Sequence, residues 1–109
     1  MRIASAVMLI FVTTSLNATV LRGNEFLVNY EKRNDMAIVN FLNGYLAGQW
    51  DSLEVTNERL ADCVGADVRM SQLVDVVAIY LKENPEIRHQ HPSKFISAAI
   101  AEKFNCPNN

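Results

Sequence analysis

Residues 71–84, SQLVDVVAIYLKEN, decide the fold. Ser71 is the predicted N-cap, because its hydroxyl can accept a hydrogen bond from the free N–H groups of the first turn. Pro85 cannot continue the helix, so the helix is expected to end at Asn84. The apolar residues recur at intervals of three and four and form one stripe on a helix: Leu73, Val76, Val77, Tyr80 and Leu81. Further apolar residues widen this stripe, so the segment is predicted to be the central helix of a small helical domain.

Three other segments have helical periodicity: residues 25–32, 36 to about 53, and 94–104. Asn24 and Asp35 are the predicted N-caps of the first two, since short polar side chains suit that position. Residues 51–67 are expected to contain helical turns in the least regular part of the chain. No stretch of any length alternates like a strand. The sequence therefore predicts an all-α fold, a small bundle of about four main helices.

Two glycines, Gly44 and Gly48, lie four residues apart in the second predicted helix. Each costs about 1 kcal/mol relative to alanine in a helix interior. Their spacing indicates either a groove where another helix approaches closely or two positions where glycine is merely tolerated.

Residues 1–18 have the layout of a secretory signal peptide, with Arg2, an apolar run over residues 3–12 and a polar tail ending at Ala18. A membrane anchor is the less favoured alternative, because the run is shorter than the roughly 20 residues that span a bilayer. Residues 19–109 are then expected to be a single exported domain. It has nine basic and twelve acidic residues and no basic cluster, which argues against binding nucleic acid or an anionic membrane.

The chain has two cysteines, Cys63 and Cys106. In an exported protein an even count indicates a disulfide. Closing a loop of 44 residues would stabilise the domain by roughly 4 kcal/mol. The alternative is a pair of free thiols, one of them a nucleophile.

Candidate catalytic or metal-binding residues are few. His89 and His91 form an H-x-H pair, but two imidazoles do not complete a zinc site, even with Glu86 as a third ligand. The sequence has no glycine-rich phosphate loop, nucleophile elbow or H-E-x-x-H pattern. We therefore expect no enzyme activity, no metal and no cofactor.

Residues 51–67 carry five acidic residues against Arg59 alone, a local charge of −4. Such a run is usually a solvated face. It would also suit a docking surface for a basic partner, where charge steers the encounter and an aromatic residue supplies affinity. The candidate partner-binding residues are Trp50, Asp51, Glu54 and Glu58.

Three pieces of sequence, in this order and spacing, resemble one known family. They are residues 23–27 (GNEFL), residues 41–48 (FLNGYLAG, similar to the family's G-Y-x-x-G element), and the last half of the chain, from Cys63 through residues 72–77 (QLVDVV) and 84–86 (NPE) to Cys106. Together they resemble the immunity proteins of the type VI secretion amidase system, the Rap/Tai-type family. The similarity covers essentially all of residues 19–109.

This resemblance implies a periplasmic, largely helical protein that tends to form homodimers. Its partner would be a peptidoglycan amidase effector, whose active-site groove it blocks without chemistry of its own. Relatives often carry two further cysteines where this chain has Tyr30 and Leu42. We expect apolar packing of Tyr30 against Leu42 to replace that second disulfide.

Two other functions remain as alternatives. One is a periplasmic chaperone or stress-response protein that exposes apolar surface on acidification and holds unfolded clients. The other is a redox or metal enzyme, which requires Cys63 and Cys106 to be free thiols.

Overall fold

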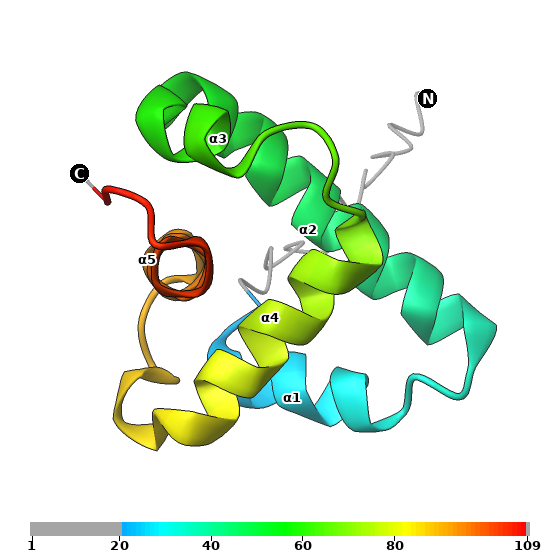
Figure 1. The fold of residues 1–109 in the computed structure, drawn as a ribbon. Helices are drawn as coiled ribbons and strands as arrows, with labels where there is room; N and C mark the ends of the chain where they lie inside the picture. The colour runs from blue at the N-terminus through cyan, green and yellow to red at the C-terminus, as the bar shows by residue number, and fades with distance from the viewer. Residues whose placement is uncertain (1–20, 109) are drawn as a thin grey trace, which may run out of the picture.

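A computed structural model describes residues 21–108, and the expected signal peptide lies outside this range. The described residues form five α-helices and one 3-10 turn, with no strand among them (Figure 1). The elements are α1 (Gly23–Glu31), α2 (Met36–Thr56), α3 (Glu58–Val64), α4 (Met70–Glu83), η1 (Pro85–Ile87) and α5 (Pro92–Phe104). The all-α prediction is confirmed, with one helix more than the four expected.

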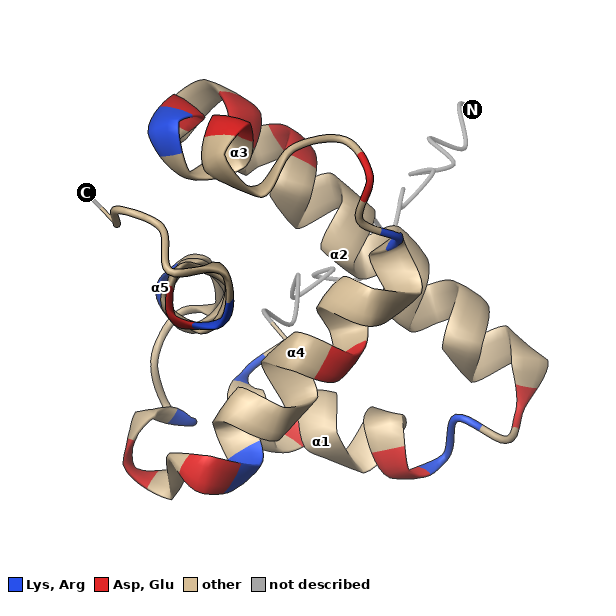
Figure 2. Ribbon diagram, in the orientation of Figure 1, with Lys and Arg blue, Asp and Glu red and all other residues tan. Residues whose placement is uncertain are grey.

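The additional helix, α3, lies in the acidic segment that we expected to be irregular. Helix α2 runs on to Thr56, and Asn57 interrupts the helical backbone with φ −143° and ψ 65°. The Asn57 side chain then accepts a hydrogen bond from the N–H of Leu60 and caps α3. Leu53 and Leu60 are both buried on either side of this break, so the core holds both helices. Figure 2 shows several acidic residues on α3 and the adjacent end of α2, besides those on other elements.

Helix α4 is the central helix, as predicted, and it packs against α1, α2 and α5. Its buried residues are Leu73, Val74, Val77, Ala78 and Leu81. The buried stripe is therefore rotated relative to the expected one, and Val76 and Tyr80 are only partly buried. The reason is that neighbours cover α4 on three sides, so residues beside the expected stripe are also enclosed.

The predicted N-cap of α4 is wrong, whereas its predicted end is confirmed. The helix begins at Met70, so Ser71 lies inside its first turn. The N-cap is Arg69, whose backbone N–H donates to the Gln72 side chain at 2.8 Å. Helix α4 ends before Asn84, which has φ −130° and ψ 68°, as expected for a residue that precedes Pro85.

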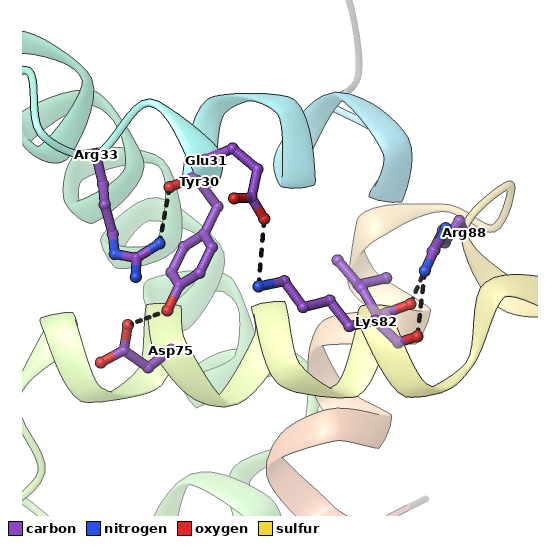
Figure 3. Close-up of polar contacts among 7 residues, drawn as sticks. Tyr30, Glu31, Arg33, Asp75, Lys82 and Arg88 are labelled. Carbon is purple, nitrogen blue, oxygen red and sulfur yellow. Dashed lines mark hydrogen bonds and ion pairs between the residues drawn. The ribbon is translucent and has the colours of Figure 1, made fainter.

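The predicted N-cap of α2 is confirmed, and that of α1 is wrong. Asp35 accepts a hydrogen bond from the N–H of Ala37 at 2.9 Å. Helix α1 begins at Gly23, one residue before Asn24, because the Gly23 N–H donates to the carbonyl of Arg88 at 2.9 Å. Arg88 also donates from Nε to the Leu81 carbonyl, which ends α4 against the start of α1 (Figure 3).

The two glycines of α2 do not form a close helix contact. Gly44 and Gly48 are exposed, and a Cβ atom added at either would meet no atom within 4 Å. The groove interpretation is thus wrong for the described residues, and glycine is merely tolerated at both positions.

The predicted disulfide joins Cys63 in α3 to Cys106 just after α5. Asn105 ends α5 in the left-handed conformation with φ 51°, and the Cys106 N–H donates to the carbonyl of Ala101 at 2.9 Å. Asn57 adds a second link, because its side chain donates to the Asn108 side chain at 3.2 Å. The C-terminal segment therefore lies against α3 and the adjacent end of α2, which together we call the acidic hairpin.

Candidate partner-binding site

A hollow of about 390 Å³ lies between the end of α2 and α3. We call it the acidic hollow. Its lining residues are Trp50, Glu54, Glu58, Ala61, Asp62, Gly65 and Ala66. It contains three of the four candidate partner-binding residues. Trp50 and Glu54 belong to α2, and Glu58 belongs to α3, which begins after the break at Asn57.

Helical spacing explains which side chains line the hollow. Trp50 and Glu54 are four residues apart and share one face of α2. Glu58 and Asp62 have the same spacing on α3. Because Asn57 is buried and breaks the helix between these two pairs, the chain turns and the two faces line one hollow.

Asp51 lies outside the acidic hollow and Asp62 lies in its lining. Asp51 does not line the hollow, since it follows Trp50 and points about 100° further round the helix. Asp62 does line it, although it was not among the candidate residues. The spacing of four from Glu58 would have identified Asp62, had α3 been recognised as a helix.

The carboxylates of the hollow have no basic partner in the structure. The ion pair found among residues 21–108 joins Lys82 to Glu31, and neither of these residues lines the hollow. Trp50 is partly buried and adds an aromatic wall. This arrangement suits a cationic group with apolar atoms beside it, because the carboxylates attract the charge and the indole ring packs on the apolar part.

Neither histidine of the H-x-H pair forms part of a metal site. His91 caps α5, with Nδ1 accepting from the N–H of Ser93 at 3.2 Å. The carbonyl of His89 accepts from the Arg22 side chain at 2.8 Å. Within the described range no three His, Cys, Asp or Glu side chains are placed to hold a metal ion.

The thiol-based alternative is wrong, because both cysteines are joined in the disulfide and neither is free. A redox or nucleophilic role would need a free thiol in the folded protein. As for membranes, none of the helices in residues 21–108 has the length and hydropathy to cross a bilayer.

Comparison with known families gives one match, to a family model described as Rap1a immunity proteins, over residues 18–106. The chain belongs to the Rap1a immunity protein family. The family resemblance found in the sequence is therefore confirmed. No curated protein and no solved structure matches the chain.

Membership of the Rap1a family gives the acidic hollow a context. Immunity proteins bind a cognate effector, and proteins of this kind are generally non-catalytic. The hollow lies wholly inside the matched range, on an exposed part of this Rap1a protein. It is accordingly a candidate surface for contact with the effector.

Proposed function

We propose that the protein is a periplasmic immunity protein that binds a type VI secretion peptidoglycan amidase and covers its active site. The observation that carries this proposal is membership of the Rap1a immunity family. The signal-like residues 1–18 support export to the periplasm, where peptidoglycan amidases act on the cell wall. The protein acts by binding alone and performs no chemistry on the substrate.

The acidic hollow is the proposed centre of the contact with the amidase. Its carboxylates would attract a basic region of the amidase and speed the encounter, while Trp50 would be buried in the complex. A stable interface covers about 800 Å² on each partner, so residues around the hollow, including Asp51, would form its rim. The interaction excludes substrate by occupying the space in front of the catalytic groove.

The proposal is tested with a purified type VI secretion peptidoglycan amidase as the binding partner. The immunity protein should bind it at a fixed ratio at neutral pH and stop its hydrolysis of peptidoglycan. Trp50 is the only tryptophan of the chain, so its fluorescence reports on the hollow during a titration when the amidase signal is subtracted. Full amidase activity at saturating immunity protein would refute the proposal, and suppression of aggregation of unrelated proteins at low pH would favour the chaperone alternative.

Matched variants distinguish the effect of charge inside the hollow from the effect of general surface charge. Glu54→Gln removes one charge inside the hollow. Asp51→Asn removes one charge from the same helix outside the hollow. We expect the Glu54 variant to slow association and to flatten its dependence on salt, because charges at the contact steer the encounter. The Asp51 variant should change both quantities less.

Homodimer formation is the second part of the proposal. Residues 36–49 of α2 contain no charged side chain, and Phe41 is 49% exposed on this helix and stacked on Tyr45. An exposed helix surface of this kind favours association with a second copy. Sedimentation analysis should show a dimer whose dissociation constant rises in Phe41→Gln. A single monomeric species at all concentrations would contradict this part without affecting amidase binding.

A further inference from the structure

A second groove lies on another part of the surface, between α4 and α5, and has a volume of about 290 Å³. It shares no lining residue with the acidic hollow. Its lining residues are Val76, Ile79, Tyr80, Glu83, Ala99, Glu102 and Lys103. We call it the α4–α5 groove.

The floor of the α4–α5 groove is apolar. Ala99 of α5 is buried, and its small side chain leaves space beside the partly buried Val76 and Tyr80 of α4. Ile79 stands at the edge with 52% of its surface exposed. Ile79 lies inside α4 and not at its end, so this exposure is not the fraying of a helix end.

The charges around the groove are mainly acidic. Glu83 and Glu102 line it from the two helices, against Lys103 alone. Neither glutamate takes part in an ion pair with any residue in the described range. Burial raises the pKa of Tyr80, and the nearby charges of Glu102 and Glu86 raise it further, so the field at this tyrosine is negative.

We propose that the α4–α5 groove is a second docking surface, which takes an aliphatic side chain that stands beside a lysine or arginine on the amidase effector. This inference rests on the proposed function. An aliphatic side chain would remove Ile79 from water, and the neighbouring cation would pair with Glu83 and Glu102. Charge complementarity therefore selects a partner surface that is apolar and basic.

A second copy of this chain is a poorer occupant. Its exposed apolar surface on α2 is uncharged over residues 36–49. Packing that surface on the groove would take Glu83 and Glu102 out of water without giving them a partner, which is costly. The groove thus fits a basic effector better than it fits another immunity protein.

The test measures binding of the same purified amidase to Ile79→Gln and to a matched control, Val28→Gln. Val28 is 55% exposed on α1 and does not line the groove. Glutamine forms helices well, so both variants should fold. We expect Ile79→Gln to weaken binding about tenfold or more, as truncation of a buried interface residue does, and Val28→Gln to leave binding unchanged.

A charge variant tests the second half of the inference. Glu102→Gln should lower the association rate and its salt dependence, whereas Glu25→Gln on α1 should not. Wild-type affinity in both Ile79→Gln and Glu102→Gln would overturn the inference while leaving the proposed function in place. Failure of the wild-type protein to bind the amidase would instead remove the proposed function, and this inference with it.

Discussion

The hydroxyl of Tyr30 donates a hydrogen bond to the carboxylate of Asp75, 45 residues away in sequence, with 2.7 Å between the two oxygen atoms (Figure 3). The bond fastens α1 to α4. Arg33 stacks on the same ring, with its guanidinium carbon 4.1 Å from the ring centroid. Leu42, the expected packing partner, lies in the same buried core as Tyr30. Tyr30 therefore holds α1 against α4 by polar as well as apolar contacts.

Replacing this hydroxyl should destabilise the fold. Tyr30→Phe keeps the buried ring and removes the bond to Asp75, so we expect the free energy of unfolding to fall by about 1–2 kcal/mol. Urea denaturation monitored by circular dichroism measures the loss. In an Asp75→Ala background the same change should cost much less, because the acceptor is already absent. Equal costs in the two backgrounds would show that the bond contributes nothing.

Stability should decline at alkaline pH. Burial is the main cause that raises the pKa of all three tyrosines, Tyr30, Tyr45 and Tyr80, above the ordinary value of 10.0. A raised pKa means that the folded protein holds these protons more tightly than the unfolded chain. The stabilisation is therefore complete below about pH 10 and is lost as the pH rises through the folded-state pKa values. Melting temperatures across this range, with phenolate absorbance as the titration readout, should show the decline starting only above the ordinary value.

Loss of the disulfide should destabilise the whole domain, with the largest effect on the acidic hairpin. Cys63 and Cys106 are separated by 43 residues, and closing a loop of this size is worth up to about 4 kcal/mol in the chain-entropy model. We expect Cys63→Ser with Cys106→Ser to lower the melting temperature markedly, and reductant to do the same to the wild type. Leu60 remains in the core and should hold α3 at low temperature. Reductant that left the melting temperature unchanged would contradict a structural role.

Much of the fold could be predicted because periodicity and proline placement act locally. The central helix and its end at Pro85 follow from residues 71–85 alone, and Asp35 needs only its own backbone neighbours to cap α2. The starts of α1 and α4 could not be predicted in this way. Gly23 begins α1 because the carbonyl of Arg88, far along the chain, accepts its N–H. Such a tertiary contact cannot be recognised from the local sequence pattern.

The grouping of residues in the acidic hollow could be predicted in part for the same reason. Trp50 and Glu54 share a face of α2 by spacing alone, so their association required no knowledge of the fold. That Asp62 and not Asp51 lines the hollow could not be predicted, because the helix break at Asn57 decides which side chains face each other. That break depends on burial of Asn57 and Leu60 in the core, which the acidic composition of the segment conceals.

Replacement of two glycines by alanine should change the stability of the protein in opposite directions. At Gly23 a Cβ atom would lie 2.8 Å from the backbone Cα of Arg88, so Gly23→Ala must displace α1 from the turn at Arg88 and should destabilise the fold by about 1–3 kcal/mol. At Gly48 the added methyl group meets nothing within 4 Å, and alanine restricts the unfolded chain. Gly48→Ala should therefore stabilise the protein by up to about 1 kcal/mol. Denaturant unfolding of both variants, at a protein concentration where the chain is monomeric, checks the pair. A loss of stability at Gly48 comparable to that at Gly23 would contradict the open surroundings of Gly48 within one chain.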